Sequence, residues 1–186
     1  MSVRPAALFA PLTPRAVLVA VLAMGAVVLL SNVLVQYPIN DWLTWGAFSY
    51  PVAFLVSNLI NRRFGPGPAR RVAWIGFLVA VVLSVWVATP RIAIASCSAF
   101  IVAQLLDITV FDRLRRGSWW RAPMVATTCS ATVDTTIFWS IAFAGSALPW
   151  VSWAAGDLAV KLAIGVCLLP PFRALLWKMA PLRATS

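Results

Sequence analysis

The stretch PMVATTCSATVDTTIFWSIAFA, residues 123–144, decides how the rest of this chain is interpreted. It is long enough to cross a bilayer, yet it carries Asp134 near its middle. A carboxylate at membrane mid-depth costs about 2.5–3.5 kcal/mol on insertion scales, so such a residue normally faces a protein interior or a water-filled cavity. The stretch therefore predicts a membrane-spanning helix that carries a transport or binding site.

The composition of the whole chain agrees with this interpretation. Hydrophobic residues make up 62% of the chain and charged residues only 11%, with a mean hydropathy of +0.90. Soluble domains are about 45–50% apolar and about 25% charged. A soluble core does not explain such an excess, whereas lipid as solvent does. The length of 186 residues leaves room for roughly six spans of about 20 residues each.

Six apolar runs are separated by turns rich in proline and glycine, which end helices for backbone reasons. The runs cover residues 15–36, 44–59 (with a polar extension to 63), 72–88, 92–110, 123–144 and 158–176. They are continuously apolar and do not alternate, which favours helices over strands. The sequence thus predicts an all-α integral membrane protein with one six-helix domain over residues 15–178. Tails of residues 1–14 and 179–186 flank this domain.

Basic residues gather in alternate connections between these runs. Arginines flank the second and fourth connections and occur at both ends of the chain, whereas the first, third and fifth connections hold only Arg91. The positive-inside rule then places both termini in the cytoplasm. A net charge of +10 could suggest nucleic acid, but charges at the ends of spans do not form a nucleic-acid footprint. The first run is too long for a cleaved signal peptide.

Several features that enzymes need are missing from the sequence. Histidine is absent, which removes the commonest general base and metal ligand. No phosphate-binding loop, nucleophile elbow or zinc-protease helix occurs. Cys97, Cys129 and Cys167 have no metal-site spacing and are expected to be small packing residues. We therefore expect no enzymatic activity, no cofactor and no metal.

Polar and aromatic side chains within the apolar runs are the candidate site residues. Residues three or four apart share a helix face, as do Asn32 with Gln36 and Gln104 with Asp107. Carboxylates, amides and rings suit a flat, hydrogen-bonding ligand. The candidate ligand-binding residues are Asp134, Asp107, Gln104, Asn32, Gln36, Asn58, Phe138, Trp45 and Lys161.

Some of these residues have simpler explanations. Asp157 and Lys161 could form an interfacial i,i+4 ion pair, and Asp134 could pair with Lys161 or an arginine for structural reasons. Asn58 could hydrogen-bond between helices, as polar residues in membranes often do. Asp112 and Arg113 are expected to form a solvated surface pair of small energetic value.

A family resemblance rests on several strings that occur in order. They are SNVLVQ (31–36), TWGAFSYP (44–51), NRRFG (61–65), QLLD (104–107), VFDRLR (110–115), WWRAP (119–123), VDT (133–135) and Lys161. With these strings the chain resembles the queuosine precursor transporters of the vitamin uptake transporter family. The resemblance extends from about Ser31 to Arg173 and so covers nearly the whole chain.

The resemblance implies import of the cyano and aminomethyl 7-deazaguanines across the bacterial inner membrane. It implies six helices similar in shape to substrate-binding subunits of energy-coupling-factor transporters. Asp134 or Asp107 would then accept the N1–H and 2-amino donors of the base. Gln104, Asn32 and Gln36 would meet its other edges, and Phe138 or a tryptophan would stack on it. Where the family usually has an aspartate this chain has Asn58, an amide that cannot ionise but can bind a ligand.

Two alternatives remain open at this stage. The chain could be a substrate-binding subunit that needs a separate ATPase, with the small residues Ala16 and Ala20 forming a docking face. It could instead be a structural membrane protein whose polar residues only pack helices. Small-residue faces also make a homodimer plausible. The sequence does not decide the energy source or the preferred deazaguanine.

Overall fold

The computed structural model describes residues 13–178 of the chain. Most of the N-terminal tail and the whole C-terminal tail of the prediction lie outside the described residues. The helices are α1 Pro14–Leu34, α2 Pro51–Phe64, α3 Pro66–Val87, α4 Pro90–Leu114, α5 Arg121–Phe143, α6 Trp150–Cys167 and α7 Leu169–Lys178. Two short strands, β1 Pro38–Asn40 and β2 Leu43–Thr44, precede a 3-10 helix, η1 Trp45–Phe48.

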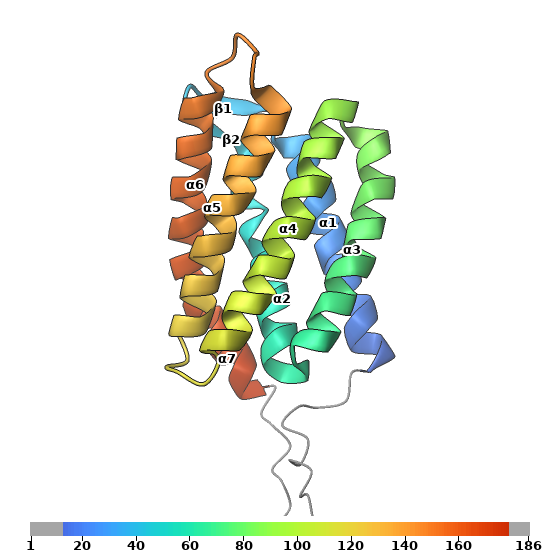
Figure 1. Ribbon diagram of the computed structural model, residues 1–186, viewed down its shortest axis with the longest axis vertical. Helices are drawn as coiled ribbons and strands as arrows, with labels where there is room; N and C mark the ends of the chain where they lie inside the picture. Colours follow the sequence, from blue (N-terminus) through green and yellow to red (C-terminus); the bar gives the residue numbers. More distant parts are fainter. Residues whose placement is uncertain (1–12, 179–186) are drawn as a thin grey trace, which may run out of the picture.

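Long helices run up and down side by side to form one bundle (Figure 1). The β1–β2 hairpin covers the upper end next to α5 and α6, while α1 begins and α7 ends at the lower end (Figure 1). The α2–α3 and α4–α5 connections, which carry the arginine clusters, also lie at the lower end. The observed order therefore fits the alternation of charge in the sequence.

Helix starts follow from local sequence. Proline occupies the first turn of α1, α2, α3 and α4, where its missing N–H is not needed and its fixed φ suits a helix. The hydroxyls of Thr13 and Thr89 accept the backbone N–H groups of Ala16 and Ile92, as N-cap residues do. The turn signals thus end one helix and begin the next with few residues between them.

Several boundaries differ from the sequence prediction; α3, for example, begins at Pro66 instead of residue 72. Residues 44–50, expected to be helical, form β2, η1 and a turn, because Pro51 starts the helix and the preceding segment pairs back on β1. The sixth run begins at Trp150 instead of residue 158 and breaks at Leu168, where Pro170 and Pro171 start the new helix α7. The segment from Pro38 to Tyr50, which contains β1, β2 and η1, is called the outer cap below.

Four helical segments are long and apolar enough to cross a membrane by length and composition: α1, Pro66–Ser84 of α3, α4, and α6 with α7 as far as Leu176. The helix α2 has 14 residues and spans about 21 Å, which is less than a hydrocarbon core of about 30 Å. The helix α5 has 23 residues, but threonines and Asp134 lower its hydropathy. Exposed Thr132 and Thr136 donate their hydroxyls to carbonyls four residues earlier, which satisfies them without water.

Alanines line part of the bundle interior beside buried aromatic residues such as Phe54 and Phe100, and large apolar side chains also cover the outside. Alanines buried on facing sides of α4 and α5 include Ala99, Ala103, Ala126 and Ala131, which lets these two helices approach closely. Leu18, Leu78 and Trp86 are exposed on α1 and α3. An apolar outer surface of this extent suits contact with lipid. The structure thus describes a mostly helical, multi-pass membrane protein.

Candidate functional site

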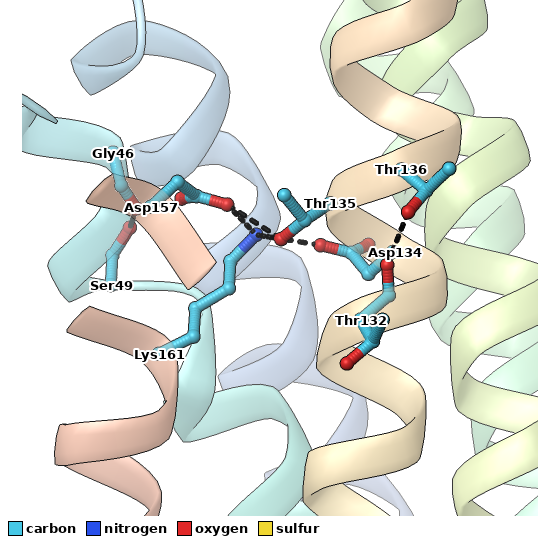
Figure 2. A network of polar contacts seen from close by, with 8 residues as sticks. All are labelled: Gly46, Ser49, Thr132, Asp134, Thr135, Thr136, Asp157 and Lys161. Atoms are coloured by element: carbon cyan, nitrogen blue, oxygen red, sulfur yellow. Dashed lines mark hydrogen bonds and ion pairs between the residues drawn. The ribbon is translucent and has the colours of Figure 1, made fainter. Parts of the chain in front are cut away.

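A buried ion-pair network joins α5 to α6. Lys161 on α6 donates from Nζ to Asp134 Oδ2 at 2.8 Å and to Asp157 Oδ2 at 2.5 Å. All three side chains are at most 6% exposed. Figure 2 shows Lys161 extended toward α5, with the two carboxylates on either side of its ammonium group. Asp157 and Lys161 lie one turn apart, which is why the i,i+4 spacing in the sequence indicated the pair.

The Asp157–Lys161 pair is buried, whereas one interpretation of the sequence placed it at the membrane interface. Thr135 Oγ1 accepts from Lys161 Nζ at 3.2 Å and donates to Asp157 Oδ2 at 2.8 Å. The Tyr50 ring centroid lies 5.0 Å from Lys161 Nζ, a distance at which a cation is attracted to the ring face. The prediction that Asp134 pairs with Lys161 is therefore confirmed.

The charges of this network do not balance. Two carboxylates face one ammonium group, so the network carries one surplus negative charge if all three groups ionise. Buried charges are stable only when they are paired and hydrogen-bonded. The Tyr50 hydroxyl lies next to the Asp134 carboxylate, and neither that hydroxyl nor Asp134 Oδ1 has another hydrogen-bond partner within residues 13–178. The arrangement can therefore accept hydrogen bonds from a donor-rich ligand.

Aromatic rings form a layer next to Asp134, toward the upper end of α5. Trp139 packs with Phe143 at 5.0 Å and with Trp153 at 6.0 Å between ring centroids. Phe138, a predicted site residue, contacts Trp139 edge-on at 5.5 Å. The indole Nε1 of Trp139 is buried, and no acceptor for it exists in the described part of the chain. Rings and an unused donor beside a carboxylate suit a flat heterocycle.

The outer cap is fastened to α6 directly above the network. Trp153 Nε1 donates to the Asn40 carbonyl at 2.9 Å, and Ser152 Oγ donates to the Asp41 carbonyl at 2.6 Å. A Cβ on Gly156 would come within 1.8 Å of the Trp42 carbonyl oxygen, so only glycine permits this approach. Gly46 lies in η1, and Ser49 is the residue that follows η1. The 3-10 helix η1 packs against α6. Figure 2 shows both residues beside Asp157. The cap therefore closes the network from above.

A second polar cluster contains Asp107, Gln104 and Asn58, all predicted site residues, between α2, α4 and α5. Ser57 Oγ donates to Gln104 Oε1, and Asn58 Nδ2 donates to Thr127 Oγ1 at 3.3 Å. Asp107 is fully buried, and neither of its oxygens has a partner among the residues described. Within residues 13–178, neither a hydrogen bond nor an ion pair joins this cluster to Asp134. The sequence could not separate Asp107 from Asp134 because spacing along one helix does not show which neighbours approach it.

The remaining predicted residues lie elsewhere. Asn32 is buried and donates to Ser84 Oγ on α3 at 2.5 Å, while Gln36 is exposed and donates to the carbonyls of Asn32 and Val87. Trp45 lies in η1, 53% exposed, with its ring 6.1 Å from Phe48. None of these three residues contacts the Lys161 network.

Sequence reasoning missed three residues of the site. Tyr50 and Trp139 carried no signal beyond being aromatic, and Asp157 was considered only as half of a helical ion pair. The sequence analysis also paired Asp112 with Arg113, but Asp112 forms an ion pair with Arg115 Nε at 2.8 Å. Residues three apart share one face of a helix, whereas adjacent residues do not. Within the described residues no three potential ligand side chains gather as a metal site requires.

The fold is that of a multi-pass membrane protein, and comparison with known proteins places the chain in the transporter class. The model of the putative vitamin uptake transporter family matches residues 44–89 and 83–175. The queuosine precursor transporter of Escherichia coli K12 is 34% identical over 180 residues, covering 80% of this chain and 80% of its own length. The probable queuosine precursor transporter of Haemophilus influenzae Rd is 36% identical over 154 residues, covering 69% of this chain and 66% of its own.

A third relative, the probable queuosine precursor transporter of Bacillus subtilis 168, is 27% identical over 157 residues, covering 68% of this chain and 69% of its own length. No solved structure matches the chain. These matches show the family. The chain belongs to the queuosine precursor transporters of the vitamin uptake transporter family.

Proposed function

We propose that this protein imports 7-cyano- and 7-aminomethyl-7-deazaguanine across the inner membrane of a bacterium, for salvage into tRNA queuosine. In this proposal one domain, residues 15–178, crosses the membrane six times, with α6 and α7 as one span and both termini in the cytoplasm. The lower end of the bundle carries the arginine-rich connections (Figure 1), which supports that orientation. The relatives' names support the substrate class.

The observation that carries the substrate assignment is the Asp134 carboxylate, 2% exposed, which has the Tyr50 hydroxyl beside it and whose Oδ1 forms no other hydrogen bond within residues 13–178. The 2-amino and N1–H groups of a deazaguanine form adjacent donors that match the two oxygens of one carboxylate. The surplus negative charge of the network strengthens such an acceptor. In this scheme Lys161 moves toward Asp157 when the base binds the Asp134 carboxylate.

The aromatic layer supplies the second part of the proposed contact. Trp139 and Phe138 offer ring faces and edges, and the unused Trp139 Nε1 can donate to the carbonyl oxygen of the base. Stacking and a directional donor together select a flat purine-like ring over an aliphatic solute. Tyr50, whose hydroxyl is also unused, completes the polar rim.

The outer cap is the proposed access gate. It lies between the network and the upper end of the bundle and is held on α6 by Ser152 and Trp153. Movement of the cap would open the site to the outside while α2, α4 and α5 keep the lower side closed. The proposed ATPase docking face is less well supported, because Ala20 is buried and Ala16 packs against the same core.

The test is rescue of queuosine in cells that cannot make the precursor. Cells expressing this chain and given the cyano or aminomethyl precursor at low concentration should recover queuosine in their tRNA. Asp134→Asn should abolish the rescue, because an amide offers one acceptor oxygen in place of two. Asp41→Asn, the same change at an exposed position, should leave the rescue intact. Normal rescue by a well-expressed Asp134→Asn protein would reject the assigned site, and no rescue by the wild type would reject the function.

A further inference from the structure

We propose that Asp107 is a proton-binding site which couples import to proton movement into the cell, an inference that rests on the proposed function. The residue sits in the lower half of α4, away from the Lys161 network. Two contacts bracket it on α2: Ser57 with Gln104, and Asn61 Nδ2 with the Ile108 carbonyl at 2.9 Å. Asp107 therefore lies at the level where α2 crosses α4.

The Asp107 carboxylate has no counter-ion. The ion pairs of residues 13–178 use Asp112, Asp134 and Asp157, and both Asp107 oxygens are buried without a partner within the same range. An ionised carboxylate in such a place is so costly that the group takes up a proton instead. A proton is therefore the cation that this position binds when the bundle is closed.

Charged groups on the surrounding helices are engaged elsewhere or lie near the ends of the bundle. On α2, Arg62 donates to the Arg115 carbonyl; on α3, Arg70 approaches Thr109 Oγ1 at 3.5 Å; on α5, Asp134 binds Lys161. The charged or titratable residues of α4 and its neighbours are Arg15, Arg62, Arg63, Arg70, Arg71, Arg91, Cys97, Asp112, Arg113, Arg121, Cys129 and Asp134. None of them hydrogen-bonds to the Asp107 carboxylate.

Other buried polar atoms of α2, α4 and α5 also lack partners. Gln104 Nε2, Ser130 Oγ and Asn58 Oδ1 are all buried and have no partner in the part of the chain described. Gln104 is one turn from Asp107 on the same face of α4. Its amide is therefore a donor on the same helix that a deprotonated Asp107 can recruit.

A small cavity lies beside Asn58, between α2, α5 and the junction of α6 with α7. It is lined by Asn58, Thr127, Leu55, Pro123 and Phe172 among others and has a volume of about 20 Å³. A cavity of that size holds about one water molecule, and neither a deazaguanine nor a hydrated metal ion fits there. Asp107 is not among the residues that line it, so the choice of a proton follows from the unpaired buried carboxylate itself.

Coupling follows from the contact between the helices that carry the two sites. Asp107 lies on α4 and Asp134 on α5, and α4 packs along α5. Release of the proton, from COOH to COO⁻ and H⁺, leaves a buried charge that the closed bundle does not neutralise. We therefore infer that proton release to the cytoplasmic water accompanies opening of the lower side and release of the base from Asp134.

The experiment uses the purified full chain in proteoliposomes with labelled 7-cyano-7-deazaguanine, which is uncharged. A pH gradient of one unit, alkaline inside, should drive about tenfold accumulation if one proton accompanies each neutral molecule. A protonophore should remove the accumulation. Asp107→Asn, an imitation of the protonated residue, should still exchange labelled for unlabelled base across the membrane but accumulate none. Ser118→Ala, at an exposed position in the α4–α5 connection, should behave as the wild type.

Separate readouts keep the two proposals apart. Failure of the wild type to bind or exchange the base rejects the proposed function, while exchange without any response to the pH gradient rejects only the proton site. Loss of base binding in folded Asp107→Asn would instead make Asp107 a substrate ligand and overturn the inference. If Asp107→Asn does not fold, the proton site is tested by the response of the wild type to the pH gradient and by Asp107→Glu. The Asp107→Glu variant retains a titratable group and should accumulate the base.

Discussion

At the scale of single residues, the balance of charge around Lys161 governs stability. Removing one partner of a buried ion pair costs about 3–5 kcal/mol because the other charge is left uncompensated. Lys161→Met leaves two buried carboxylates facing each other, whereas Asp157→Asn leaves one carboxylate and one ammonium. The two substitutions therefore act in different ways on the same network.

We expect Lys161→Met to lower the free energy of unfolding by about 3–5 kcal/mol. We expect Asp157→Asn to lower the free energy of unfolding by less than about 1 kcal/mol, because this substitution removes the surplus negative charge. Thermal unfolding of each purified protein in detergent, followed by tryptophan fluorescence, measures the difference. Equal losses for the two variants would show that the surplus charge is already neutralised by something other than Lys161.

The sequence predicted the importance of Asp134 and Lys161 because ionisable residues at membrane depth are costly and stand out. It could not predict that Asp134 has a partner and Asp107 has none, since that depends on how α5 meets α6 and how α4 meets α2. Tyr50 and Trp139 were likewise invisible, because an aromatic residue in an apolar run most often faces lipid or core.

At the scale of elements, the outer cap depends on close backbone contact. Gly156 lets the Trp42 carbonyl approach α6, and Gly46 does the same for the backbone of Val35, where a Cβ would lie at 2.9 Å. The sequence predicted helix for residues 44–50 because they are as apolar as a span. Hydropathy does not distinguish a buried cap from a helix, whereas Pro51 marked the true start of α2.

Gly156→Ala should lift the cap from α6 and reduce uptake. Forcing a methyl group into a packed contact costs about 1–3 kcal/mol, which corresponds to roughly five- to 150-fold weaker closure over the base. Gly67→Ala is the matched control, because a Cβ there meets nothing within 4 Å. Uptake of labelled base into cells is the measurement, and equal uptake by both variants would mean that the cap does not cover the site.

The lower end of the bundle is held by a different device. Arg115 donates from Nη2 to both the carbonyl and the side-chain oxygen of Asn61 at 2.6 Å, and its guanidinium forms an ion pair with Asp112. Arg62 donates back to the Arg115 carbonyl at 2.6 Å. These contacts join the ends of α2 and α4 below Asp107.

Arg115→Lys should weaken this junction, because an ammonium group does not reproduce the fork of a guanidinium. We expect a loss of about 1–3 kcal/mol in the free energy of unfolding and faster hydrogen exchange in the last turn of α2. Arg113→Lys, at an exposed position on the same helix end, is the control. No difference between the two variants would assign the junction to packing of the apolar side chains alone.

At the scale of the whole molecule, the order of the bundle follows from two simple patterns in the chain. Apolar runs of about one membrane thickness predicted the helices, and the alternation of arginines predicted which connections share a side. The patterns could not show that α2 is short and completed by the cap, or that α6 and α7 are separated at Leu168. Those features depend on proline positions and on contacts between segments distant in the sequence.

The orientation has its own test in whole cells. After the three cysteines are replaced by alanine, single cysteines placed at Trp42 and at Gly117 should label from opposite sides. An impermeant maleimide should reach the cysteine at position 42 in intact cells and the one at position 117 only after the membrane is opened. Labelling of both positions in intact cells would contradict a six-span arrangement with cytoplasmic termini.

The central claim is that Asp134, beneath the outer cap, holds the deazaguanine. An experimental structure of the full chain with bound 7-cyano-7-deazaguanine tests it most directly. We predict that the N1–H and 2-amino groups lie on the Asp134 carboxylate with the ring against Trp139 or Phe138, while Lys161 keeps Asp157. A base held elsewhere, with the Asp134–Lys161 pair unchanged, would contradict the claim.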